Sequence, residues 1–138
     1  MTSRVVYKGE LRTEAVHIKS GQIIITDAPP DNQGKGEAFS PTDLLATSLA
    51  SCMLTIMGIS ARDRSIPIEG TILEITKHMA SDPRRVAAID ITVIMPDYAY
   101  SSHEKKILEA AARTCPVSFS LHPDLKQNII FIWKDSIE

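Results

Sequence analysis

The chain has 138 residues, of which 43% are hydrophobic and 23% are charged, and its formal net charge is −2. This length suits one domain whose core needs no disulfide or metal, so we expect residues 1–138 to form a single domain. The composition excludes disorder for most of the chain. Because no basic cluster exceeds the pair Arg84–Arg85, it also argues against nucleic-acid binding.

The N-terminal segment predicts β-structure. Val5–Tyr7 is a short strand candidate, and Glu10–Lys19 with Gln22–Thr26 predicts a hairpin around a Ser-Gly turn. Asp27–Phe39 follows as a polar loop rich in Pro and Gly. Its Gly-Lys-Gly triplet lacks the spacing of a phosphate-binding loop, so we interpret the segment as a flexible connection that borders a site.

A central helix is predicted over Ser40–Ser60. Ser40 can cap it, Pro41 suits the first helical position, and Asp43 can complete a capping box. Apolar residues recur at three- and four-residue steps and place a thiol on the apolar stripe: Leu45, Leu49, Cys52, Ile56 and Ile59. Small residues elsewhere on the helix allow other backbones to approach, so we expect it to be buried nearly all round.

The uncharged stretch Leu44–Ala61 has to be weighed against a membrane span, which needs about 20 mainly apolar residues. This stretch is shorter and is diluted by several Ser and Thr residues. The N-terminus also lacks the apolar core of a signal peptide. We therefore expect no membrane partner. Two distant cysteines without an export signal indicate a reducing compartment, so a cytoplasmic location is expected.

Two further strands are predicted after the central helix. Ile68–His78 and Val86–Met95 flank a turn at Asp82–Pro83. The second of them alternates clearly, with one apolar face: Ala87, Ile89, Ile91, Val93 and Met95. Two antiparallel strands with one apolar face suit packing on the central helix.

A second helix is predicted to begin at Ser101 or Ser102. Its apolar stripe carries the other thiol: Leu108, Ala111, Ala112 and Cys115. Pro116 disfavours helical geometry at Cys115, so that thiol is expected at the helix end.

A short helical turn over Val117–Leu121 and a closing strand over Asn128–Lys134 complete the predicted elements. The strand is apolar on both faces and is therefore expected to be well covered. The order β-β-β-α-β-β-α-β predicts an α+β fold, with helices packed against antiparallel sheet.

Each cysteine lies on the inner stripe of a predicted helix, so Cys52 and Cys115 could meet if those faces share a core. A single cysteine in such a position is usually a small hydrophobe. Two of them, on the two long helices of a protein from a reducing compartment, favour catalytic or redox work.

The segments around the cysteines resemble those of a known family. SPTDLLATSLASC resembles the first-cysteine signature of the OsmC/Ohr proteins, AARTCPVSFSLHP resembles their second-cysteine signature, and the separation of the cysteines also fits. The resemblance implies an OsmC-like α+β fold, with antiparallel sheets around two long central helices in an intertwined homodimer. It also implies a cofactor-free thiol peroxidase of the bacterial cytosol that reduces organic hydroperoxides or hydrogen peroxide.

Carried over by position, the resemblance makes Cys52 the peroxide-attacking thiol and Cys115 the resolving thiol. Attack on the peroxide would give a sulfenic acid, which condenses with the second thiol to a disulfide that an external thiol reductant resets. A buried thiol ionises less readily than an exposed one, so the attacking cysteine needs a cation nearby. Apolar surroundings would favour an organic hydroperoxide.

The family's peroxidases use an arginine from the N-terminal hairpin region, held by a carboxylate ten residues before the first cysteine. Arg12 is the nearest candidate, Arg4 is an alternative, and a merely solvated strand residue is the other interpretation of Arg12. Thr42 occupies the carboxylate position, which departs from the family pattern. Asp43 is adjacent, but one residue rotates a helical side chain by about 100°, so its capping role is favoured. The departure is typical of a divergent subgroup.

The remaining polar residues give weaker signals. The histidines lack the paired spacing of a zinc site, so we expect no metal and no cofactor: His17, His78, His103 and His122. No hydrolase triad is evident around the candidate serines: Ser48, Ser51 and Ser118. Asp31 and Glu37 could line a dimeric pocket, while Tyr98 and Tyr100 suit packing.

Three interpretations of the sequence therefore stay open. The favoured one is a two-cysteine peroxidase. The second is a small-ligand-binding or redox-sensing module on the same fold, whose thiols respond to oxidants without turnover. The third is that both cysteines are only core residues.

Overall fold

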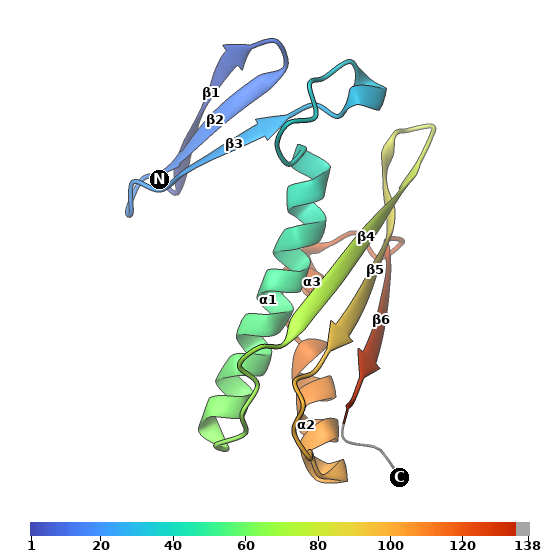
Figure 1. Ribbon diagram of the computed structural model, residues 1–138. Coiled ribbons are helices and arrows are strands. Elements are labelled where there is room, and N and C mark those ends of the chain that lie inside the picture. Colours follow the sequence, from blue (N-terminus) through green and yellow to red (C-terminus); the bar gives the residue numbers. More distant parts are fainter. Residues whose placement is uncertain (135–138) are drawn as a thin grey trace. The chain divides into compact units, whose positions relative to one another are not determined.

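The computed structural model describes residues 1–134 (Figure 1). Two compact units make up the chain, Met1–Leu45 and Ala46–Glu138, and each is described by itself. The predicted element order is confirmed, with one 3-10 turn added in the long loop.

The first unit is built on a three-stranded antiparallel sheet. Its strands are β1 (Ser3–Gly9), β2 (Arg12–His17) and β3 (Ile23–Asp27), in the order β1-β2-β3. The predicted hairpin is confirmed as β2 and β3. The loop that follows contains the 3-10 turn η1 (Pro30–Asn32).

The sheet of the first unit carries apolar side chains on both faces. Neighbouring residues of β1 and β3 are between 42% and 64% exposed: Val5, Val6, Tyr7, Ile23, Ile24 and Ile25. Because adjacent strand residues point to opposite faces, neither face of this sheet is fully covered within the first unit.

Helix α1 (Pro41–Asp63) has the predicted start. The Ser40 N–H donates to Asp43 Oδ2 at 2.9 Å, and the Asp43 N–H donates to Ser40 Oγ at 3.0 Å. This reciprocal pair is the predicted capping box. The helix continues three residues beyond the predicted end at Ser60. Among the described residues, α1 is long and apolar enough to cross a bilayer by length and composition alone, a test that core helices of soluble proteins also pass.

The expectation that α1 is buried nearly all round is wrong. Its buried residues form one stripe: Ala46, Leu49, Ala50, Met53, Met57 and Ala61. Cys52 and Ile56 are only half-buried at the border of this stripe, whereas Leu45 and Ile59 are exposed. Apolar residues occur all around α1, so their spacing alone did not determine which side meets the core.

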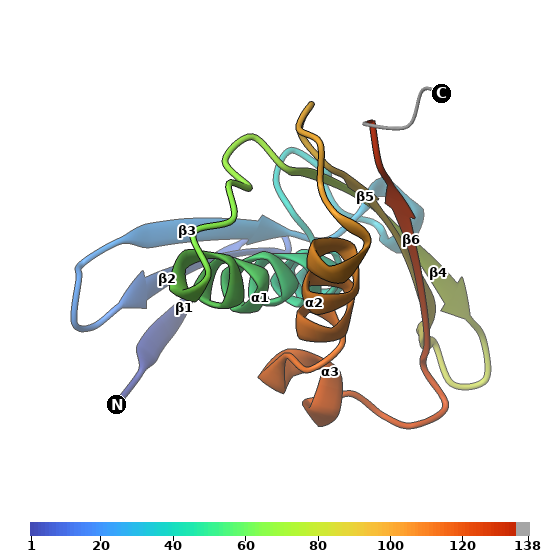
Figure 2. The ribbon, with the colours of Figure 1, turned by 90° about the horizontal axis from the view of Figure 1, so that it is seen from below.

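The second unit contains a three-stranded sheet of β4 (Ile72–Ala80), β5 (Arg85–Ile94) and β6 (Lys126–Ile132). β4 is antiparallel to β5, as predicted, but β6 runs parallel to β5, which the expected antiparallel sheet did not include. In Figure 2, α1 and α2 (Ser102–Ala112) lie side by side along this sheet. The core lies between these helices and the inner face of the sheet, around Ile89, Ile91 and Val93.

Several strand details differ from the predictions. β4 begins at Ile72 rather than Ile68, because Thr71 closes a turn through its N–H and its hydroxyl, which both donate to the Ile68 carbonyl. A register shift beside His78 pairs Met79 with Val86, so Val86 is buried in place of the predicted Ala87.

The expectation that the closing strand is well covered is wrong within this chain. β6 presents alternate residues to solvent, and Ile130 is 63% exposed. The opposite face of β6 carries Ile129 and Phe131, which pack against the core. An apolar sequence on both faces therefore does not establish that both faces are covered by the same chain.

The second helix follows the prediction closely. Ser101 caps α2 and forms a capping box with Glu104. α2 ends at Ala112, and Cys115 lies beyond it, immediately before the short helix α3 (Pro116–Ser120). The predicted α+β class is confirmed.

An aromatic cluster connects the segment before α2 to the end of β6. Tyr100 makes edge contacts with Tyr98 and Trp133, and Trp133 stacks on Phe131 at 5.5 Å between ring centroids. The Tyr100 hydroxyl donates to the Pro67 carbonyl oxygen at 2.5 Å. One buried ring thus joins three segments of the second unit.

We expect Tyr100→Phe to lower the free energy of unfolding by about 1 kcal/mol, because the variant keeps the ring contacts and loses only the hydrogen bond to Pro67. Urea denaturation followed by circular dichroism measures this. Tyr98→Phe is the matched control, since its hydroxyl makes no hydrogen bond within residues 1–134. An equal loss in both variants would contradict the assignment of the effect to the Pro67 bond.

Candidate functional site

Cys115 lies at the junction between α2 and α3. It caps α3, and its Sγ accepts a hydrogen bond from the Ser118 N–H at 3.3 Å. Pro116 supplies the first residue of α3, where a missing N–H costs no helical hydrogen bond. The Cys115 side chain is fully buried. Sequence and local geometry together thus place a thiol in the core with backbone N–H groups of Ser118 and Val117 directed at it.

Cys52 reaches the same place from α1. Its side chain is half-buried, packs against the core and is close enough to Cys115 to raise the pKa of that thiol. Both cysteines are free thiols in this structure. The two predicted redox residues, 63 positions apart in sequence, are therefore neighbours within the second unit.

The surroundings of Cys115 favour its protonated form. Burial raises the pKa of the Cys115 thiol, the neighbouring Cys52 raises it further, and the hydrogen bond from the Ser118 N–H acts in the opposite direction. Because the pKa is raised, the thiol form dominates at neutral pH, and the thiolate fraction grows only as the pH rises well into the alkaline range.

We expect alkylation to distinguish the two thiols. At pH 7, iodoacetamide should modify the half-buried Cys52 first and the buried, protonated Cys115 about tenfold or more slowly, and the rate at Cys115 should climb as the pH rises. Peptide mass spectrometry at timed intervals measures both rates. The Cys52→Ser variant is the control for indirect effects. Equal modification rates at pH 7 would contradict the assigned burial and protonation.

Arg12 belongs to the first unit, where two carboxylates hold it. Register pairing of β2 with β3 sets Arg12 opposite Asp27. The guanidinium donates through Nε and Nη2 to the two oxygens of Asp27, both at 2.7 Å, and through Nη2 to Glu37 at 3.0 Å. Asp27 is 1% exposed and also accepts the Glu37 N–H at 3.1 Å. This bidentate arrangement fixes the plane of the guanidinium.

The ion pair shifts both partners toward their charged forms. Hydrogen bonds from Arg12 are the main reason that the pKa of Asp27 is lowered, and hydrogen bonds to Asp27 are the main reason that the pKa of Arg12 is raised. Sequence reasoning missed Asp27. The predicted turn at Ser20–Gly21 would set Glu14 across from Asp27, whereas the observed register pairs Asp27 with Arg12.

The other predicted residues of the first unit have different positions. Arg4 lies exposed on β1, opposite Val16. The Thr42 hydroxyl lies 3.2 Å from the Ser40 hydroxyl. Asp43 forms the capping box, and Asp31 lies in η1. Glu37, the remaining candidate, accepts a hydrogen bond from Arg12.

We expect the Asp27 carboxylate to make stability depend on pH in the acid range. Its folded pKa lies below its unfolded value of about 4, so its contribution is present above about pH 4 and is lost as the pH falls through the folded pKa. The difference in urea midpoint between the wild type and Asp27→Asn should therefore be larger at pH 7 than at pH 2.5. A difference that does not depend on pH would contradict this.

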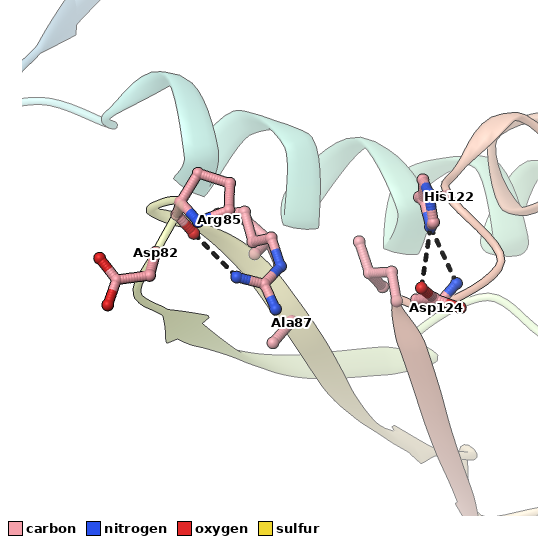
Figure 3. A pocket seen from close by; sticks show the side chains of 8 residues that line it. Asp82, Arg85, Ala87, His122 and Asp124 are labelled. Carbon is pink, nitrogen blue, oxygen red and sulfur yellow. Dashed lines mark hydrogen bonds and ion pairs between the residues drawn. The ribbon is translucent and has the colours of Figure 1, made fainter.

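His17, His78 and His122 have polar partners of their own. His78 Nε2 contacts Asp90 at 2.7 Å on the outer face of the second sheet, and His17 Nδ1 contacts the Ser20 hydroxyl at 2.6 Å. His122 borders a cavity of about 340 Å³ that also involves Arg85 and Asp124 (Figure 3). Across residues 1–134, no group of three or more His, Cys, Asp or Glu side chains has the arrangement of a metal site.

The cavity in Figure 3 lies between the β4–β5 turn and the loop before β6. Arg85 Nη1 donates to the carbonyl oxygens of Ser81 and Pro83, and the Asp124 N–H donates to His122 Nδ1 at 3.0 Å. These polar groups are thus engaged in shaping the two loops, and neither cysteine lines the cavity.

Comparisons with known proteins identify the family. A model of the OsmC-like protein family matches residues 34–129. The chain is 57% identical to a protein of Psychrobacter arcticus 273-4 with the provisional name of osmotic stress induced and detoxification response protein; the match covers 96% of each chain, with a TM-score of 0.92. A search of curated proteins gave no match.

More distant solved structures share the fold. An organic hydroperoxide resistance protein OsmC from Legionella pneumophila is 16% identical, with a TM-score of 0.74 and 95% and 96% of the two chains covered. An OsmC-like protein from Mycoplasma pneumoniae is 21% identical, with a TM-score of 0.75 and 95% and 94% covered. On the family match over residues 34–129 and the 57% identical relative, the chain belongs to the OsmC-like protein family.

Proposed function

We propose that this protein is a cytoplasmic peroxidase that reduces organic hydroperoxides through Cys52 and Cys115, without a cofactor. The interaction between the two free thiols is the observation that carries the proposal. Family membership agrees with it, since fold relatives from Legionella pneumophila and Elizabethkingia anophelis are named organic hydroperoxide resistance proteins.

The first chemical step is an attack by the Cys52 thiolate on a peroxide oxygen. A sulfur–oxygen bond forms while the oxygen–oxygen bond breaks, so Cys52 is oxidised to a sulfenic acid and the peroxide leaves as an alcohol after taking up a proton. The partial burial of Cys52 supports this role, because a substrate must reach the attacking sulfur and Cys115 is fully buried.

The second step joins the two sulfurs. The Cys115 sulfur attacks the Cys52 sulfur, a disulfide forms, and the hydroxyl group leaves as water with the proton that Cys115 releases. An external dithiol then reduces the disulfide by exchange and is itself oxidised. The influence of Cys52 on the pKa of Cys115 supports this step, because it requires the two thiols to be neighbours.

Arg12 is proposed to stabilise the attacking thiolate and the negative charge that develops on the leaving oxygen. The family's carboxylate position is occupied by Thr42, and we propose that Asp27 and Glu37 orient the arginine instead. The three charge-assisted hydrogen bonds that Asp27 and Glu37 accept from Arg12 support this role for the two carboxylates.

A homodimer is proposed as the working form. The support is the incomplete cover of apolar residues, since both faces of the first sheet carry exposed aliphatic side chains and Ile130 of β6 is exposed. A second copy of the chain would cover such surfaces. Analytical ultracentrifugation at micromolar concentration measures the oligomeric state directly.

Consumption of cumene hydroperoxide or tert-butyl hydroperoxide with an excess of dithiol tests the function. Sustained turnover, with a Cys52–Cys115 disulfide trapped after one equivalent of peroxide in the absence of reductant, is the expected result. Inertness of both thiols to peroxide would leave them as core residues and end the proposal.

A binding or sensing module is the second candidate. A groove of about 500 Å³ between α1 and α2, lined in part by Ile56, Ile59 and Ile107, offers room for a small apolar ligand. A single round of disulfide formation without continued turnover would favour this candidate over the enzyme.

A further inference from the structure

We propose that Gln127 is a positioning residue that sets the reactivity of Cys115 by fixing the Ser118 backbone N–H against the Cys115 sulfur. In its catalytic form this proposal rests on the proposed function, where Cys115 is the resolving thiol. Its structural basis is a continuous chain of hydrogen bonds that joins β6 to α3 and ends at the thiol.

One side-chain amide holds one residue at two points. The Ser118 hydroxyl donates to Gln127 Oε1 at 2.6 Å, and Gln127 Nε2 donates to the Ser118 carbonyl oxygen at 3.2 Å. Both bonds are partly buried, and Gln127 lies on the inner face of the sheet beside Ile89. Two bonds to the same residue fix its orientation as well as its position, which a single bond does not.

These two bonds between Gln127 and Ser118 matter because α3 has only five residues. A helix of that length is not stable alone and keeps its geometry through tertiary contacts. Gln127 provides such a contact from β6, at the centre of α3. Without it, the Ser118 N–H is free to turn away from Cys115.

The Ser118 N–H has a particular importance for this thiol. The Cys115 side chain is fully buried, so the backbone donor at 3.3 Å takes the place of water as a hydrogen-bond partner. When Cys115 gives up its proton to attack the sulfenic acid at Cys52, the sulfur becomes anionic in an apolar setting. A fixed N–H stabilises that anion more than it stabilises the neutral thiol.

The step that Gln127 would affect is the disulfide formation proposed above. Cys115 loses a proton, its sulfur forms the bond to the Cys52 sulfur, and the hydroxyl group leaves as water. Gln127 exchanges no proton or electron. It acts only through Ser118, so its loss should slow this step and leave the oxidation of Cys52 by peroxide unchanged.

Gln127→Leu tests the proposal, because leucine fills similar space on the inner face and removes both bonds. Asn128→Ala is the matched control on β6, since Asn128 lies on the opposite face, where it donates to Asp90. Ser118→Ala removes the bond from the Ser118 hydroxyl to Gln127. Ser120→Ala is its control, because the Ser120 hydroxyl donates to Pro116 within α3. Circular dichroism establishes that each variant is folded.

The first measurement does not depend on peroxide. Thiolate absorbance at 240 nm is followed against pH in a Cys52→Ser background, with the variant that lacks both cysteines as the blank. Gln127→Leu should titrate at a higher pH than its background, Ser118→Ala should show a smaller change in the same direction, and the two controls should show none. An unchanged titration in folded Gln127→Leu overturns the proposal; if that variant does not fold, an unchanged titration in Ser118→Ala does so.

The second measurement follows the sulfenic acid. With one equivalent of cumene hydroperoxide and dimedone trapping, the Cys52 sulfenic acid should form at the wild-type rate in Gln127→Leu and persist roughly tenfold longer. A wild-type lifetime with a shifted titration would overturn the role in resolution. If the wild type does not react with peroxide but the titration shifts as expected, the proposed function fails while the effect of Gln127 on Cys115 is supported.

Discussion

Cys52→Ser should abolish sustained hydroperoxide consumption, whereas Cys115→Ser should react with one equivalent and then stop. A hydroxyl group cannot replace the thiolate that attacks the peroxide, so the first variant has no route to a sulfenic acid. The second variant forms that acid but has no internal thiol to condense with it. Wild type and variants are compared by coupled consumption of a dithiol and by intact mass.

The two variants also separate the competing interpretations. A gain of one oxygen atom in Cys115→Ser, trapped by dimedone at Cys52, assigns the first step to Cys52. Retained turnover in Cys52→Ser would remove Cys52 from that role. Because the thiol-to-hydroxyl change is small, a folding defect is tested separately by the urea midpoint of each variant.

Arg12→Met should lower the second-order rate constant for Cys52 oxidation by about a hundredfold, the effect expected when a preorganised charge is removed from a reacting centre. Asp27→Asn should lower this rate constant less, by about tenfold. Glu37 still binds the guanidinium in that variant, while the bidentate pairing with residue 27 is weakened. Stopped-flow measurement of sulfenic acid formation gives these constants without any influence from the reductant.

Arg4→Met is the control for the loss of a positive charge from the first unit. It should react at close to the wild-type rate, since Arg4 lies exposed on β1 and is not part of the carboxylate cluster. A large effect in Arg4→Met with none in Arg12→Met would exchange the roles of the two arginines. Equal small effects in both would indicate that neither guanidinium activates the thiol.

Local signals in the sequence predicted local structure well. The capping box at Ser40 and the start of the second helix at Ser101 were readable because every participant lies within three residues of the cap. The alternation of β5 and the helix break at Pro116 were readable for the same reason. These features depend on chain neighbours and little on the rest of the fold.

Long-range features were not readable to the same extent. The buried side of α1 depends on which face the sheet and α2 meet, and apolar residues on several sides left that choice open. The parallel pairing of β6 likewise depends on the path of the chain through α2 and α3. Spacing therefore identified the elements, while their packing required coordinates.

The residues of the candidate site also differ in whether the sequence alone could identify them. Cys52 and Cys115 were singled out by residue type and by the family signatures. Asp27 was missed because its importance depends on an exact strand register opposite Arg12. Gln127 was missed because its partner, Ser118, lies across a loop on a different element, and an isolated glutamine in a strand has no distinctive pattern.

The parallel pairing of β6 with β5 also determines when the thiol pair can form. Cys115 lies on the crossover that carries the chain from β5 to β6, so its surroundings are complete only after β6 has docked beside β5. During synthesis the chain emerges from its N-terminal end, and Cys52 is made long before β6. A nascent chain that ends before β6 therefore holds Cys115 without the Gln127 contact that β6 brings to α3.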